Sequence, residues 1–196
     1  MKFKNLEMTG FKSFSEKTNV LIEKGLTGIV GPNGCGKSNI VEALRWCMGE
    51  NSAKSMRGSG MEDVIFSGTS NRPSKNISEV ALLLDNNEKN GPAQYKEFDE
   101  ITIRRKIEKD KGSKYYINDK EVRARDVQTL FADLSTGAHS PSLISQGRIG
   151  QLVTAKPIER KSILEEAAGI SGIHARRQEA ETRLNAAENN LKRADE

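Results

Sequence analysis

One segment has residue types and a spacing that suit phosphate binding: Gly31-Pro32-Asn33-Gly34-Cys35-Gly36-Lys37-Ser38. It fits the pattern G-x-x-x-x-G-K-[ST] at every fixed position. The glycines let the backbone curl until successive N–H groups point into one concavity that holds an anion. Lys37 would reach the β- and γ-phosphates of a nucleotide, and the Ser38 hydroxyl would ligate Mg²⁺. The segment therefore predicts a site for ATP and magnesium.

Such a loop needs a strand before it and a helix after it. The apolar run Leu26 to Val30 predicts the strand. A helical period follows and ends at Gly49, with one face formed by Ile40, Val41, Leu44 and Met48. The positive N-terminal end of that helix would add to the attraction for phosphate.

The rest of the chain alternates short strands with loops. Alternating or apolar segments predict strands over 3–9, 19–23, 64–66, 77–84 and 101–107, with a return strand over 114–117. A helix is expected over 126–134, and loops over 51–60 and 135–146. The order of these elements predicts an α/β domain that extends to about Ala155.

The period changes near the end of the sequence. Apolar and small residues recur at alternating steps of three and four, interrupted only by Arg177: Ile170, Ile173, Arg177, Ala180, Leu184, Ala187, Leu191 and Ala194. This spacing predicts the start of a coiled coil over residues 156–196, and a single helix packed on the domain is the alternative. No Gly or Pro ends the pattern, so we expect the coil to continue beyond Glu196.

The charge is concentrated in one segment. The chain of 196 residues carries a net charge of +4, whereas 104–125 alone holds nine basic and four acidic residues, a local +5. A localised basic surface suits a phosphate backbone, and a solvated strand face is the other interpretation. The sequence has two cysteines outside any metal-ligand spacing, no signal peptide, and no apolar run near the roughly 20 residues of a membrane span. We therefore expect a cytoplasmic protein with free thiols and no membrane partner.

Four short motifs occur in an order that resembles one family: Phe11-Lys12-Ser13-Phe14, Gly36-Lys37-Ser38-Asn39, Ser55-Met56-Arg57-Gly58 and Ile144-Ser145-Gln146-Gly147. The chain resembles the N-terminal half of the ATPase head of a bacterial SMC (structural maintenance of chromosomes) protein. The tail Glu165-Glu166-Ala167-Ala168-Gly169-Ile170 is similar to the passage from head to coiled coil. The resemblance implies an ABC-ATPase-type P-loop head, with a mixed sheet and flanking helices, followed by a long coiled-coil helix.

The resemblance also implies roles for residues outside the phosphate loop. Gln146 would join Ser38 at the metal and sense the γ-phosphate, and Arg57 would contact nucleotide phosphate near the head interface. Lys12, Ser13 and Asn39 would lie beside the nucleotide. Part of the basic segment would face DNA, and the candidate residues are Arg104, Lys106, Arg123 and Arg125.

The resemblance places no catalytic residue in this segment. The Walker B Asp, the catalytic Glu and the signature motif would come from the C-terminal half of the head. Two sequence features imitate these motifs: Asp85, which ends an apolar strand, and Leu134 to Gly137. Both precede Gln146, contrary to the family order, so we reject them. His139 and His174 have no partner at ligand spacing and are expected at the surface.

The resemblance implies double-stranded DNA and accessory bridging subunits as partners, and a homodimer formed through a distant hinge and ATP-engaged heads. Such a protein would couple ATP-driven head engagement to chromosome condensation and segregation. Two alternatives stay open: the head of a DNA-repair ABC ATPase, and a non-catalytic DNA-binding scaffold.

Overall fold

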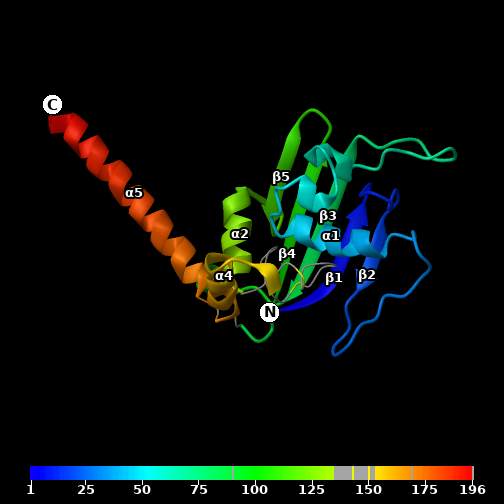
Figure 1. The fold of residues 1–196 in the computed structure, drawn as a ribbon, viewed down its shortest axis with the longest axis horizontal. Coiled ribbons are helices and arrows are strands. Elements are labelled where there is room, and N and C mark those ends of the chain that lie inside the picture. The colour runs from blue at the N-terminus through cyan, green and yellow to red at the C-terminus, as the bar shows by residue number, and fades with distance from the viewer. Residues whose placement is uncertain (90, 135–142, 144–149, 151–152, 169, 196) are drawn as a thin grey trace.

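Six strands form one antiparallel sheet in the computed structural model, which describes residues 1–89, 91–134, 143, 150, 153–168 and 170–195 (Figure 1). The strands are β1 (Lys2–Thr9), β2 (Thr18–Leu21), β3 (Ile77–Asp85), β4 (Glu100–Glu108), β5 (Gly112–Ile117) and β6 (Lys120–Val122). They lie in the order β2-β1-β3-β4-β5-β6. The α/β class is confirmed, and every pair in this order is antiparallel, so the described part of the sheet contains no parallel pair.

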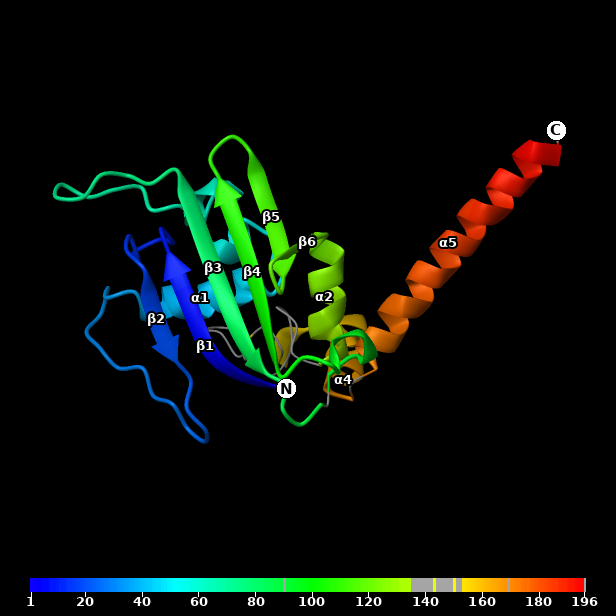
Figure 2. The same ribbon diagram turned by 180° about the vertical axis from the view of Figure 1, so that it is seen from behind.

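One face of the sheet carries the core. Along β4, Ile101, Ile103, Arg105 and Ile107 are buried on this face, and Thr102, Arg104 and Lys106 alternate with them on the opposite side. Helix α1 (Lys37–Cys47) packs across this face with Trp46 and Cys47 fully buried. In Figure 2 the opposite face of β1, β3 and β4 is turned toward the viewer, with no described helix over it. The chain therefore folds with one covered and one open sheet face.

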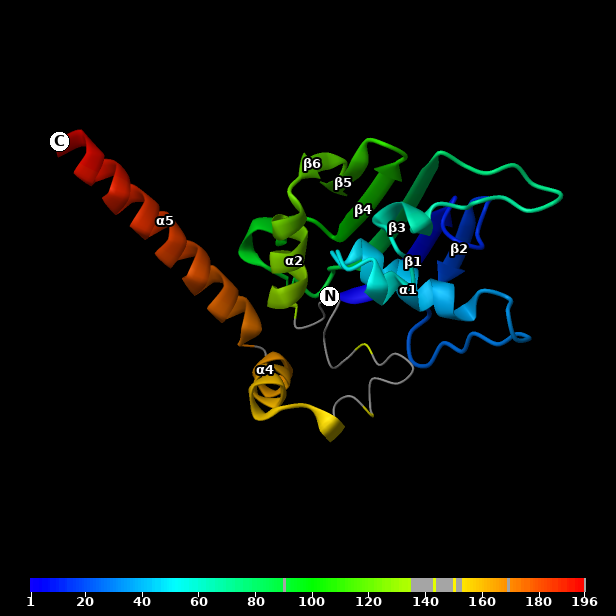
Figure 3. The ribbon, with the colours of Figure 1, turned by 45° about the horizontal axis from the view of Figure 1, so that its top comes forward.

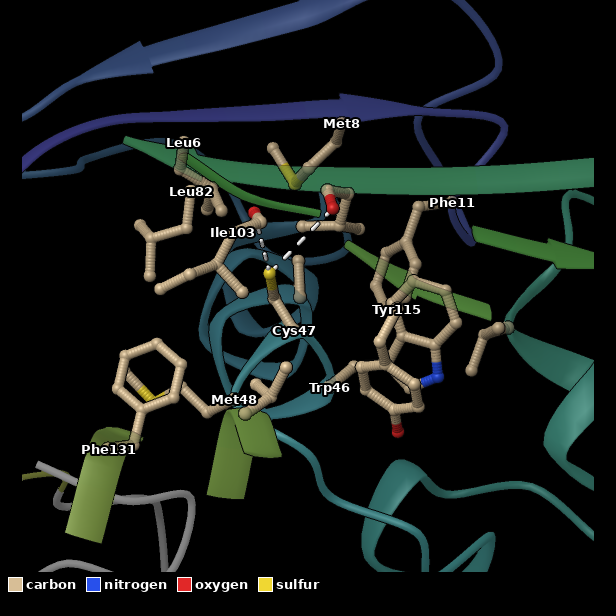
Figure 4. Packing of buried hydrophobic residues seen from close by; sticks show 14 of the residues in the cluster. Leu6, Met8, Phe11, Trp46, Cys47, Met48, Leu82, Ile103, Tyr115 and Phe131 are labelled. Carbon is tan, nitrogen blue, oxygen red and sulfur yellow. Dashed lines mark hydrogen bonds between the residues drawn. The ribbon is translucent and has the colours of Figure 1, made fainter. Parts of the chain in front are cut away.

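The core is closed by aromatic and sulfur-containing side chains (Figure 4). The rings of Phe11 and Trp46 lie 5.5 Å apart and are tilted by 48°, a favourable arrangement for aromatic pairs. Cys47, the last residue of α1, projects toward the sheet, and its thiol points at the carbonyl oxygens of Val80 and Ile103 (Sγ to O distances 3.7 and 3.4 Å). Helix α2 (Ala124–Asp133) completes the core with Val127, Leu130 and Phe131.

Helices α4 (Pro157–Ala167) and α5 (Ser171–Asp195) lie beyond the sheet domain in the chain. Helix α5 follows α4 and extends away from the sheet (Figures 1 and 3). The helix predicted from the heptad pattern is confirmed. Ile173, Leu184 and Leu191, three apolar positions of that pattern, are more than half exposed. None of the described helices is long and apolar enough to span a membrane.

Two predicted strands are wrong. Leu26 to Val30 has no regular secondary structure and pairs with no described strand, and Leu26 is 98% exposed. An apolar run becomes a strand only where a neighbouring edge accepts its backbone hydrogen bonds, and none of the six described strands offers one here. At 64–66, Val64 ends a 3₁₀ turn that begins at Met61, and Ile65 forms only an isolated bridge with Phe11.

Candidate functional site

The phosphate loop is an exposed turn that leads directly into the first turn of α1. Gly34 and Gly36 have φ angles of +83° and +97°, a left-handed conformation that favours glycine. A Cβ atom on Gly36 would lie 2.5 Å from the Ser13 hydroxyl oxygen. A larger residue at this position would therefore both strain the backbone and collide with Ser13. The first turn of α1 contains no acidic residue. The backbone thus presents N–H groups and a positive helix end without a competing carboxylate.

Lys37 folds back over this loop. Its ammonium donates hydrogen bonds to the carbonyl oxygens of Gly31 and Pro32, both at 2.6 Å, and lies 3.7 Å from the Cys35 sulfur. Ser38 is exposed in the first helical turn. An ammonium, a hydroxyl and a helix N-terminus at one place suit a phosphate chain, and the hydroxyl oxygen suits a hard cation such as Mg²⁺.

The structure brings four further predicted residues to the same end of α1. The Asn39 amide donates to the Ser13 hydroxyl at 2.8 Å, and Arg57 Nη2 donates to Asn39 Oδ1 at 2.9 Å. Lys12 lies in the same network, through a residue that the sequence analysis missed. That residue is Glu42, whose carboxylate forms ion pairs with both Lys12 and Arg57. Three segments that are distant in sequence, at 12–13, at 39–42 and at Arg57, therefore meet beside the loop.

Glu42 could have been found from the helical period. It lies one residue before Ala43 and four before Trp46, both fully buried, so its position faces the core. A charged residue on a buried helix face requires a partner, and this requirement is the signal. The partners cannot be named from sequence, because Lys12 and Arg57 lie 30 and 15 positions away.

Several predictions concern residues that the structure leaves undescribed. Gln146, His139 and most of Leu134 to Gly137 lie outside the described residues, as does the side chain of His174. The rejected Asp85 is the last residue of β3, and its carboxylate accepts hydrogen bonds from the backbone N–H and the side-chain amide of Asn87, at 2.9 and 2.8 Å. The backbone hydrogen bond in particular lowers the pKa of Asp85.

The four candidate DNA contacts lie on two different elements. Arg104 and Lys106 are on the open face of β4, whereas Arg123 and Arg125 are exposed at the N-terminal end of α2. Arg104 forms ion pairs with Glu79 (3.5 Å) and Asp119 (3.0 Å), and its guanidinium stacks on the Tyr116 ring at 4.4 Å. These neighbours offset its charge, so Arg104 contributes little to an anion-binding surface.

One cation of the basic segment faces the core. Arg105 is 2% exposed and lies between the rings of Trp46 and Tyr115, 4.5 and 4.6 Å from their centroids. It donates hydrogen bonds to the backbone oxygens of Trp46 (2.8 Å) and Glu50 (2.6 Å) at the end of α1. Burial lowers the pKa of Arg105. The charge count of the segment therefore overstates what its surface offers to DNA.

Comparisons with known proteins agree with this geometry. A family model described as "RecF/RecN/SMC N terminal domain" matches residues 2–147. The Chromosome partition protein Smc of Cereibacter sphaeroides is 59% identical over all 196 residues, which make up 17% of that protein. The Smc head domain of Pyrococcus furiosus, solved with an extended coiled coil and bound to the C-terminal domain of ScpA, has a TM-score of 0.80. It is 33% identical, and the match covers 99% of this chain and 48% of that one.

The match to a second solved structure spans nearly the whole of that solved chain. That structure was described in work on ATP-driven dimerization and DNA-stimulated activation of SMC ATPases, and the match has a TM-score of 0.72 at 33% identity. The match covers 85% of this chain and 99% of that one.

Proposed function

This chain belongs to the RecF/RecN/SMC N-terminal domain family, and on that premise we propose that it is the ATP-binding half of the ATPase head of a chromosome-organising SMC protein. The observation that carries the proposal is the phosphate loop at the start of α1, with Lys37 inside it and Ser13, Asn39 and Arg57 beside it. The activity proposed for the whole protein is ATP-driven head engagement that organises chromosomal DNA.

The residues of this chain would bind and orient the nucleotide. The N–H groups of the loop and the N-terminal end of α1 would hold the phosphates, and Lys37 would turn from the loop carbonyls to the β- and γ-phosphates. The Ser38 hydroxyl, with Gln146, would hold Mg²⁺, which neutralises charge on the phosphate chain during transfer. Arg57 would supply a second cation on the exposed side of the loop.

Hydrolysis also requires a carboxylate that positions the attacking water. Among the described residues, the acidic side chain tied to this network is Glu42, which already pairs with two cations. The chain spans 17% of the length of the relative from C. sphaeroides, so we assign the Walker B Asp and the catalytic Glu to the remainder of the protein. The exposed apolar segment Leu26 to Val30 supports this assignment, because it offers an unpaired edge to a strand from the second half of the head.

We further propose that the domain boundary lies near Ala155 and that α5 begins a coiled coil. Its exposed apolar positions Ile173, Leu184 and Leu191 suit a partner helix. The coil would lead to a hinge that joins two copies, and DNA and an accessory subunit would complete the assembly. The ScpA domain on the P. furiosus head supports an accessory subunit of that kind. We place the protein on the chromosome in the cytoplasm.

A turnover measurement tests the half-head assignment and separates it from the scaffold alternative. The isolated chain should bind Mg·ATP but hydrolyse it far below the roughly one per second or faster of typical enzymes. Addition of the second half of the head should restore hydrolysis, and Lys37→Ala should abolish it again. A chain that hydrolyses ATP alone would contradict the half-head assignment, and a complete head that binds ATP without turnover would indicate a scaffold.

A further inference from the structure

Glu42 is an almost buried carboxylate shared by two cations beside the phosphate loop. Only 9% of its side chain is exposed, and each oxygen contacts a different residue: Oε2 contacts Lys12 Nζ and Oε1 contacts Arg57 Nε. Glu42 lies on the same helix as Lys37 and Ser38, about one turn further along. A buried charge persists only when it is paired, so this one carboxylate fixes two segments of the chain relative to α1.

The backbone is strained at both of these basic residues, Lys12 and Arg57. Lys12 and Arg57 have φ angles of +47° and +54°, in a region that non-glycine residues adopt only when their surroundings enforce it. Lys12 also donates to the carbonyl oxygen of Met56, the residue directly before Arg57. Lys12 is thus fixed by Glu42, and through its hydrogen bond to Met56 it also fixes the backbone turn that contains Arg57. The contacts with Glu42 and Met56 hold both residues in this conformation at one place beside the phosphate loop.

The contacts of Arg57 leave one side of its guanidinium toward solvent. Nε is anchored on Glu42, Nη2 donates to Asn39, and the side chain is 58% exposed. Asn39 directly follows Ser38, so the guanidinium of Arg57 lies next to the first turn of α1. Glu42 carries one negative charge and its two partners carry two positive charges. The group therefore keeps one net positive charge, which is available to an anionic ligand at Arg57.

We propose that Glu42 and Lys12 are positioning residues: together they form a buried clamp that aims Arg57 at the terminal phosphate of the nucleotide. The inference rests on the proposed ATP-binding function. It revises the expected role of Lys12, which then acts through Arg57 and not by direct contact with the nucleotide. Because a cation at the terminal phosphate favours ATP over ADP, the clamp sets the preference between the two nucleotides.

The test compares dissociation constants for Mg·ATP and Mg·ADP in the full-length protein. Arg57→Ala should lower the preference for ATP over ADP by about tenfold, the size of one charge-assisted hydrogen bond. Glu42→Gln and Lys12→Met should each lower the preference severalfold, and neither should lower it further when combined with Arg57→Ala. Glu79→Gln, which removes a carboxylate next to Arg104 on the open face, is the matched control and should leave the preference unchanged.

The outcomes separate the clamp from the proposed function. If the unaltered protein binds neither nucleotide, or if Lys37→Ala binds both as well as the unaltered protein does, the proposed function fails. If the unaltered protein binds and prefers ATP but Glu42→Gln and Lys12→Met keep that preference, the clamp is overturned. Additional loss from Lys12→Met in the Arg57→Ala background would also overturn it, because Lys12 would then contact the nucleotide directly. Lys12→Met keeps the test valid if Glu42→Gln does not fold.

Discussion

The substitution Arg105→Met removes a buried cation while it keeps an unbranched apolar side chain between Trp46 and Tyr115. The carbonyl oxygens of Trp46 and Glu50, which accept hydrogen bonds at 2.8 and 2.6 Å, would lose their donor. Each unmade buried hydrogen bond costs about 1–3 kcal/mol. The two ring contacts add about 1 kcal/mol or more.

An opposing term reduces this loss. Met has no charge to desolvate, and removing a buried charge recovers several kcal/mol of desolvation. We therefore expect a net decrease of about 2–4 kcal/mol in the free energy of unfolding. Such a decrease is a large fraction of the 5–15 kcal/mol of a typical domain.

Urea unfolding followed by circular dichroism measures this decrease. The control is Arg104→Met, one residue away on the opposite face of β4, where ion pairs in contact with solvent predict a loss of less than about 1 kcal/mol. If Arg105→Met is as stable as the unaltered chain, desolvation outweighs the contacts of Arg105, and the reasoning that its hydrogen bonds to Trp46 and Glu50 stabilise the fold is refuted.

Three further predictions concern thiols, pH and DNA. Exposed Cys35 should react with an alkylating reagent and Mg·ATP should slow that reaction, whereas buried Cys47 should react only on unfolding. Mass spectrometry of the labelled peptides checks this, and equal labelling of both thiols would contradict it. Burial raises the pKa of Cys47 and of Tyr115 to about 12 each, so both are held in the protonated form by the fold. The stability that this protonation contributes is present below the pKa values of the unfolded chain, about 8.5 for Cys and 10 for Tyr, and is lost as the pH rises from about 9 toward 12. Cys47→Ala should therefore flatten the decrease in the free energy of unfolding between about pH 9 and 10, as measured by urea titrations. An unchanged slope would contradict this. In the complete head with ATP, Arg123→Gln and Arg125→Gln should each reduce the slope of log K for DNA binding against log salt concentration by about 0.9, whereas Arg104→Gln should not. A smaller slope for Arg104→Gln alone would contradict our placement of the DNA contacts.

The elements around the loop could be predicted because local signals specify them. Gly36 and Lys37 lie in a pattern whose backbone requirements are local, and the alternation of Ile101, Ile103 and Ile107 fixes which face of β4 is buried. Both predictions depend only on residues near in sequence. The structure confirms the helix after the loop and the antiparallel return of β5 onto β4.

The remaining features depend on contacts between distant residues. The run from Leu26 to Val30 has strand composition, yet a strand also needs an edge to pair with, which composition does not reveal. Arg105 counts as a surface cation in any sum of charge, although its place among alternating buried Ile residues shows that it faces the core. Glu42 could be recognised as a buried charge but not matched to Lys12 and Arg57, because only the folded chain brings them together.

The central claim is that Gly31 to Ser38 binds the phosphates of ATP, and calorimetric titration of this chain with Mg·ATP tests it most directly. Lys37→Ala should weaken binding by at least about tenfold, the value of a lost charged contact. Its melting temperature without nucleotide should stay unchanged, because the hydrogen bonds of Lys37 are to exposed loop carbonyls. An affinity for Mg·ATP that Lys37→Ala leaves intact would contradict the account.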